Sequence, residues 1–271
     1  MNALEALKKG FDLVKGLVVV IGIIVIFNCV TSGVVISIVG LNPNPERVGE
    51  MAGVMVILSI CIMLAWIFME GGVFCSVLSQ IKSGDNGVSG FIGNCLKYFV
   101  RLLGIGFVAG LITVVIWFAG ALVTGIIVAM GQGTNPFFNT LALILFGIAV
   151  IFSALLIMPL LISHYVVVIE NGKIIASLKK ALGLFKQYWG RFVALFLLIT
   201  LILLVVSFIS NLISVLLTKT IPNAGILAVF QIAIAGVVNG IMSVFSSCCL
   251  MSMVLAVMTP QAKEEVVISA A

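Results

Sequence analysis

Residues 102–130 read LLGIGFVAGLITVVIWFAGALVTGIIVAM, an unbroken apolar stretch without a charged side chain. A helix needs about 20 such residues to cross the roughly 30 Å of hydrocarbon in a bilayer. The same criterion predicts six spans: 16–38, 51–78, 102–130, 139–168, 192–217 and 224–258. The last stretch is longer than a straight span requires, which indicates a tilted helix or one that extends past the membrane.

The composition agrees with a chain that is surrounded by lipid. Hydrophobic residues make up 63% of the 271 residues and charged residues only 8%, whereas a soluble domain has about 45–50% apolar and about 25% charged residues. We therefore predict an all-α fold, a polytopic transmembrane helix bundle that forms one integral membrane domain over residues 1–271. The net charge of +5 is modest and does not indicate a nucleic-acid partner.

The basic residues predict the orientation of the chain. Of the 14 Lys and Arg residues, all except Arg47 and Lys219 fall in the N-terminal segment, in the second and fourth segments between spans, or in the tail 259–271. Short loops rich in Lys and Arg face the cytoplasm. We expect a plasma-membrane protein whose N-terminus and C-terminus are both cytoplasmic.

Two of the basic segments have the pattern of amphipathic helices. Residues 3–15 and 173–187 each place apolar side chains on one face and lysines mostly on the others. Such helices lie in the headgroup plane and favour anionic lipid. The candidate headgroup contacts are Lys8, Lys9, Lys15, Arg101, Lys179, Lys180, Lys186 and Arg191.

The same segments suggest an internal repeat. Leu7-Lys8-Lys9, followed by Leu13 and Lys15, matches Leu178-Lys179-Lys180, followed by Leu184 and Lys186. A weaker match places Arg101 at the equivalent position of a middle unit. We predict three units, each an amphipathic helix followed by a transmembrane hairpin. Their ranges are 1–84, 85–169 and 170–258.

A family resemblance rests on the stretch from Val168 to Leu198. An acidic residue and Asn-Gly are followed by Ile-Ile-Ala-Ser-Leu-Lys-Lys-Ala-Leu-Gly-Leu-Phe-Lys, an aromatic pair and a new span. The stretch resembles a segment of a broad group of prokaryotic six-helix membrane proteins. That group includes the membrane domain fused to some glycerophosphodiester phosphodiesterases. The resemblance implies an integral membrane protein and supplies no catalytic residue, since the phosphodiesterase domain is absent from these residues.

Four polar residues inside the predicted spans need a reason, because polar groups in hydrocarbon are unfavourable. Glu70 and His164 either form a proton or ion site, or make hydrogen bonds to neighbouring helices and to backbone carbonyls. Asn28 and Asn239 either line a midplane cavity or make interhelical hydrogen bonds. A relay between Glu70 and His164 would require the two side chains to meet, which their positions in the sequence do not decide.

The sequence favours a protein that is not an enzyme. It has no Gly-x-Ser-x-Gly, Walker lysine loop or His-Glu-x-x-His. The aspartates, Asp12 and Asp85, both lie outside the spans. The chain has one histidine, and its six cysteines form no Cys-x-x-Cys pair, so we expect no metal and no cofactor.

Two functions remain open. The basic segments favour a protein that binds or organises anionic membrane lipids, or regulates a membrane-protein partner, through its cytoplasmic helices. The alternative is a small transporter or channel with a midplane polar site built from some of Asn28, Glu70, His164 and Asn239.

The predicted orientation can be tested with a thiol reagent that does not cross membranes. Cys95 lies in the second basic segment and should be labelled only from the cytoplasmic side. Labelling from the outside would contradict the orientation.

Overall fold

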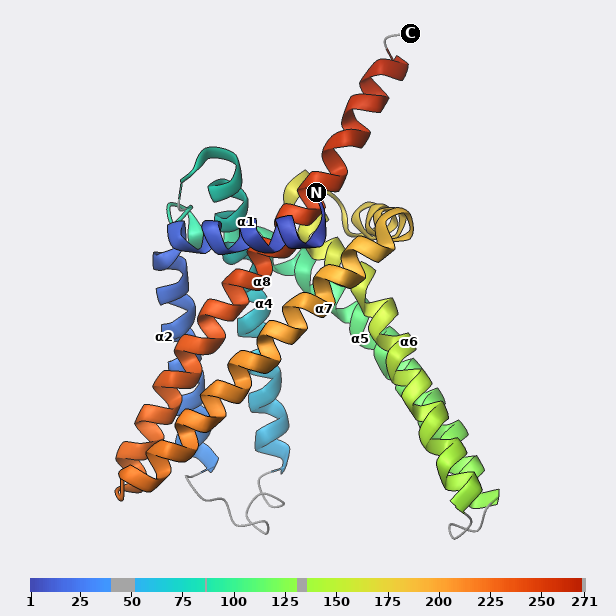
Figure 1. Ribbon diagram of the computed structural model, residues 1–271. Coiled ribbons are helices and arrows are strands. Elements are labelled where there is room, and N and C mark those ends of the chain that lie inside the picture. Colours follow the sequence, from blue (N-terminus) through green and yellow to red (C-terminus); the bar gives the residue numbers. More distant parts are fainter. Residues whose placement is uncertain (40–51, 86, 131–135, 270–271) are drawn as a thin grey trace. The chain divides into compact units, whose positions relative to one another are not determined.

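The computed structural model describes residues 1–39, 52–85, 87–130 and 136–269, and within these ranges it is built of helices joined by short turns. The chain order, shown in Figure 1, is α1 (Ala3–Gly16), α2 (Val18–Val39), α4 (Ala52–Ser83), α5 (Phe91–Met130), α6 (Pro136–Glu170), α7 (Ile174–Thr220) and α8 (Ala224–Ser269). The all-α prediction is confirmed for these residues.

Five helical segments are long and apolar enough to cross a membrane. They are Val18–Ile38, Ala52–Ser83, Phe91–Ala129, Ile174–Thr220 and Ala224–Thr259. Helix α6 contributes two shorter apolar stretches, Thr140–Ala149 and Leu155–Glu170. A helical, multi-pass, membrane-embedded protein follows from these lengths and compositions.

Contacts between helices divide the chain into two compact units. The first unit comprises Met1–Phe99 and Tyr188–Ala271, and the second comprises Val100–Gln187. Glu70, Asn28 and Asn239 therefore belong to the first unit, and His164 belongs to the second.

Helix α8 is the centre of the first unit, where it contacts α1, α2 and α4. Two glycines of α8 make close contacts with α2. A methyl group on Gly236 would lie 2.6 Å from the Cys29 sulfur, and one on Gly240 would lie 2.7 Å from a Val25 methyl group. Small residues at such a spacing let helix backbones approach closely in a membrane. The Gly236-x-x-x-Gly240 motif therefore has α2 as its partner.

Helix α1 lies across the long axes of α2 and α8 (Figure 1). It begins with a capping box, in which Asn2 accepts a hydrogen bond from the Glu5 amide at 2.8 Å and the Asn2 amide donates to the Glu5 carboxylate at 2.9 Å. It ends at Leu17, whose φ of −109° and ψ of 23° interrupt the helix before α2. Gly10 packs against Cys249, and the Phe11 and Phe245 rings lie 4.5 Å apart.

Buried residues of α4 gather in the half that leads to the basic segment 82–101. Gly71, Val73, Phe74 and Val77 are buried there, whereas Val56 and Ile57 in the other half are exposed. Lipid tails cover exposed apolar side chains without penalty, so a spanning helix does not need protein contacts along its whole length.

Within the second unit, α5 and α6 meet through aromatic and small residues. The Trp117 and Phe146 rings lie 5.9 Å apart in an edge-to-face arrangement. A methyl group on Gly120 would lie 3.2 Å from the Ala149 methyl group. The two helices thus approach closely over about one turn of α5.

Replacing Gly236 and Gly240 by leucine should destabilise the first unit, because each new side chain would overlap α2. Overpacking of this kind costs about 1–3 kcal/mol, which thermal unfolding in detergent would measure. Gly22→Leu is the matched control, since nothing lies within 4 Å of a methyl group added at Gly22. Equal unfolding temperatures for the double variant and the control would contradict the assigned contact.

The orientation test needs a different reporter, because Cys95 is fully buried. Ser89 is exposed in the same basic segment, so a Ser89→Cys variant, with Cys61 replaced by alanine, should react with an impermeant thiol reagent only from the cytoplasmic side. Reaction from the outer side alone would reverse the assigned orientation.

Candidate functional site

The predicted headgroup contacts are mostly exposed, as their proposed role requires. Lys8, Lys9, Lys15, Lys179, Lys186 and Arg191 are exposed, Lys180 is half-buried and pairs with the Glu170 carboxylate, and Arg101 is half-buried. Lys15 also pairs with Asp12 at 3.4 Å, but both side chains are well exposed, so this ion pair contributes little to stability.

Helix α1 and the first part of α7 share an arrangement of three faces, one with buried small residues, one with exposed apolar side chains and one with lysines. Ala6 and Gly10 are buried in α1, and Ser177 and Ala181 are buried at the equivalent positions of α7. Each helix thus presents small residues to the protein. This small-residue face was missed from the sequence, although the spacing of four residues between the two small side chains could have indicated it.

Large apolar side chains occupy a different, exposed face of both helices. Leu4 is 66% exposed and Phe11 51%, and their equivalents Ile175 and Leu182 are 70% and 53% exposed. Exposed apolar side chains beside exposed lysines are the surface that a helix at a membrane interface needs, because the apolar groups enter the lipid while the amines meet the headgroups.

The end of each amphipathic segment also has the same local conformation. The backbone of Tyr188 has φ −123° and ψ 24°, close to the values at Leu17, and it interrupts α7 in the same way that Leu17 separates α1 from α2. Tyr188 follows Leu17 by the same offset that relates Lys8 to Lys179.

Arg101 and the turn between α6 and α7 form a compact structure in the second unit. One guanidinium nitrogen of Arg101 donates to the Asn171 carbonyl at 3.0 Å, to the Asn171 side-chain oxygen at 2.8 Å and to the Gly172 carbonyl at 3.3 Å. Asn171 has a φ of 52°, a left-handed conformation that asparagine adopts more readily than most residues. Arg101 thereby holds the turn that leads into Lys173 and α7.

A groove of about 710 Å³ lies at this turn. It is lined by Arg101, Lys173, Ile174, Ile175, Ala176 and Lys179. Sequence reasoning identified Arg101 and Lys179 as separate headgroup contacts but missed Lys173 and the groove. Only the fold brings Arg101 beside residues that follow it by more than 70 positions.

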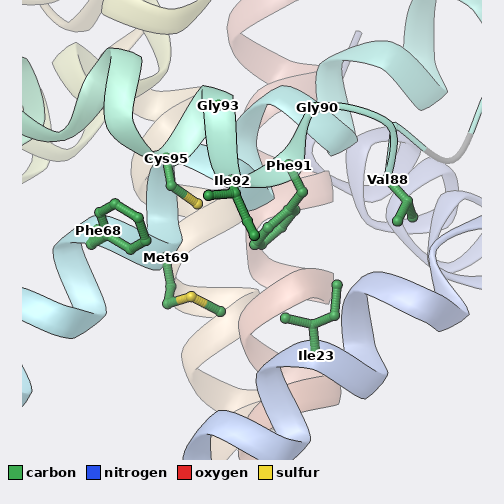
Figure 2. Close-up of a pocket in the computed structure, with 9 residues that line it drawn as sticks. All are labelled: Ile23, Phe68, Met69, Val88, Gly90, Phe91, Ile92, Gly93 and Cys95. Atoms are coloured by element: carbon green, nitrogen blue, oxygen red, sulfur yellow. The ribbon is translucent and has the colours of Figure 1, made fainter.

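Another cavity, of about 620 Å³, lies in the first unit (Figure 2). The cavity is lined by Ile23 of α2, by Phe68 and Met69 of α4, and around the start of α5 by Val88, Gly90, Phe91, Ile92, Gly93 and Cys95. Its lining includes no charged side chain, and Glu70, although adjacent to Met69, is not part of it. This cavity therefore offers no site for an ion.

The polar residues in the spans have separate surroundings. Glu70 is half-buried and accepts a hydrogen bond from the side chain of Trp66, one turn earlier in α4. His164 is half-buried in the second unit. Asn239 is exposed on α8, so its side chain does not line an enclosed polar cavity among the described residues.

Asn28 is the exception among these residues. It is half-buried on α2, and its side-chain nitrogen is buried without a hydrogen-bond partner among the described residues. A buried amide in this state is unfavourable by about 1–3 kcal/mol.

No protein-family model, curated protein or solved structure matches the chain. The resemblance to the membrane domain of glycerophosphodiester phosphodiesterases therefore stays a prediction from the sequence.

Replacing Arg101 by glutamine should loosen the turn that it holds. Loss of three hydrogen bonds from a charged donor leaves the carbonyls of Asn171 and Gly172 dependent on water. Amide hydrogen exchange at residues 170–177 should become at least tenfold faster than in the unsubstituted protein. Lys82→Gln is the control, because Lys82 is exposed and lies outside the second unit. Unchanged exchange in the Arg101 variant would show that the turn does not depend on the guanidinium.

Proposed function

We propose that the chain is a non-enzymatic, six-span membrane protein that binds anionic lipids through basic amphipathic helices at its cytoplasmic face. Through them it organises lipid or regulates a membrane-protein partner. The observation that carries the proposal is the shared surface of α1 and residues 174–187. In both, a pair of small residues is buried (Ala6 and Gly10, Ser177 and Ala181), and large apolar side chains at equivalent positions (Leu4 and Phe11, Ile175 and Leu182) are exposed beside exposed lysines.

The length of α6 supports a sixth span. Pro136–Glu170 is a continuous helix of 35 residues, and about 20 are enough to cross the hydrocarbon. With α6 counted, an even number of spans returns the C-terminus to the side of the N-terminus. This topology agrees with the distribution of Lys and Arg.

The three repeat units, 1–84, 85–169 and 170–258, are supported by the matching faces and the matching interruptions at Leu17 and Tyr188. The middle unit does not share the buried small-residue positions, because Ile92 and Leu96, which align with Ala6 and Gly10 when Arg101 aligns with Lys15, are 69% and 65% exposed. Phe91, Cys95, Tyr98 and Leu102 are buried at spacings of four, three and four residues. It also differs in that α5 continues without an interruption from Phe91 to Met130. In the middle unit the basic segment and the span therefore form one helix.

Neutralising the exposed lysines of both amphipathic helices should reduce bound anionic lipid. A Lys or Arg near an anionic surface contributes about 1 kcal/mol, equivalent to about fivefold in affinity. A variant with Lys8, Lys9, Lys15, Lys179 and Lys186 changed to glutamine should therefore retain far less phosphatidylglycerol on native mass spectrometry. Lys219→Gln is the control, since Lys219 lies on the opposite side in the proposed topology. Undiminished lipid retention in the five-lysine variant would refute the proposal.

Transport is the second candidate function, and the buried, unpartnered amide of Asn28 favours it. Glu70 lies in the same unit, on the neighbouring helix α4. If these residues form an ion site, Glu70→Gln should abolish an ion or proton flux in proteoliposomes that the unsubstituted protein supports. Absence of any flux with the unsubstituted protein would remove this candidate.

A further inference from the structure

We propose that the groove at the start of α7 is a specific site for one anionic phospholipid. The lipid phosphate binds beside Lys173, Lys179 and the guanidinium of Arg101, and one acyl chain lies along Ile174, Ile175 and Ala176. The inference rests on the proposed lipid-binding function and assigns it to one defined site in the second unit.

The charge around the groove is strongly one-sided. Residues 100–187 contain a single acidic residue, Glu170, and five Lys and Arg residues. The Glu170 carboxylate is engaged by Lys180, which does not line the groove. Three of the five basic residues line the groove, and a phosphate oxygen is a suitable acceptor for their N–H groups.

The backbone adds to this positive potential. Helix α7 begins at Ile174, and its first helical hydrogen bond runs from the Ser177 amide to the Lys173 carbonyl at 3.0 Å. The amides before Ser177 have no partner within the helix, and the helix dipole places a partial positive charge at this end. The residues that carry these amides line the groove.

The apolar part of the groove is held in place by a close contact with α5. A methyl group on Gly104 would lie 2.7 Å from the terminal carbon of Ile174. This packing fixes the first turn of α7 on α5 and leaves Ile175 70% exposed. A free phosphate ion would gain nothing from an exposed isoleucine, whereas an acyl chain would cover it, so the groove suits a lipid.

Arg101 has a positioning role as well as a charge. Its hydrogen bonds to Asn171 and Gly172 fix the residues that directly precede Lys173. The lysine is thereby attached to an ordered turn, and binding needs to order fewer groups. The equivalent helix α1 has Asn2 at the position of Lys173, so the first unit lacks this third cation.

The first experiment compares two double variants of equal charge. The Lys173→Gln/Lys179→Gln variant removes two cations of the groove, and Lys8→Gln/Lys9→Gln removes two exposed lysines of α1. Each protein is titrated in detergent with phosphatidylglycerol or phosphatidylcholine and measured by native mass spectrometry. We expect phosphatidylglycerol to bind the groove variant at least tenfold more weakly than the unsubstituted protein. The α1 variant should lose less binding than the groove variant, because Lys8 and Lys9 contact headgroups without lining the groove.

The second experiment blocks the apolar part without changing the charge. Ala176 is exposed and lines the groove, so Ala176→Phe should fill it and weaken the same binding event at least fivefold. Leu182→Phe is the matched control, because Leu182 is exposed on the same helix and does not line the groove. Circular dichroism verifies that both variants remain helical.

The outcomes separate the site from the general function. Equal loss of phosphatidylglycerol in the groove and α1 variants would overturn the specific site but leave lipid binding by basic helices intact. No preference of the unsubstituted protein for phosphatidylglycerol over phosphatidylcholine would overturn both. Displacement of the lipid by millimolar inorganic phosphate, together with wild-type binding in the Ala176→Phe variant, would assign the groove to a free anion and overturn the lipid proposal.

Discussion

In a membrane, helices gain little from burying apolar side chains against one another, because lipid tails are equally apolar. The first unit instead depends on close contact at small residues. Gly236 and Gly240 of α8 let α2 approach closely, and Gly10 of α1 packs against Cys249 of α8. Each contact places α8 within reach of another helix, so α8 is the element on which the others assemble. The same principle positions α7 in the second unit, where Ile174 fills the space left by Gly104.

This reliance on small residues explains how an amphipathic helix can be attached to the protein and still face lipid. Ala6 and Gly10 are buried, and Phe11 packs against Phe245. Leu4 and Phe11 nevertheless remain 66% and 51% exposed beside Lys8 and Lys9. The start of α7 follows the same arrangement, which makes the basic surface available to headgroups.

The groove in the second unit is a local elaboration of that surface. Its cations come from α5, from the turn before α7 and from α7 itself, and Arg101 holds the turn that brings them together. Residues on one helix face act as independent weak contacts, whereas residues that converge on one volume bind a single phosphate at lower entropic cost. Glu70 belongs to the first unit and His164 to the second.

Apolar length, the position of lysines and the periodicity of residues 3–15 are local properties, so the sequence alone determined the helical membrane class and the amphipathic segments. The matching of Leu7-Lys8-Lys9 with Leu178-Lys179-Lys180 likewise needed no structure. Which small residues make contact, and which large ones stay exposed, depended on the partner helix, and only the tertiary structure decided it. The groove depended on it as well, because Arg101 and Lys173 meet through a left-handed turn at Asn171 and the packing of Ile174 on Gly104. No local pattern encodes a contact between residues so far apart in the chain.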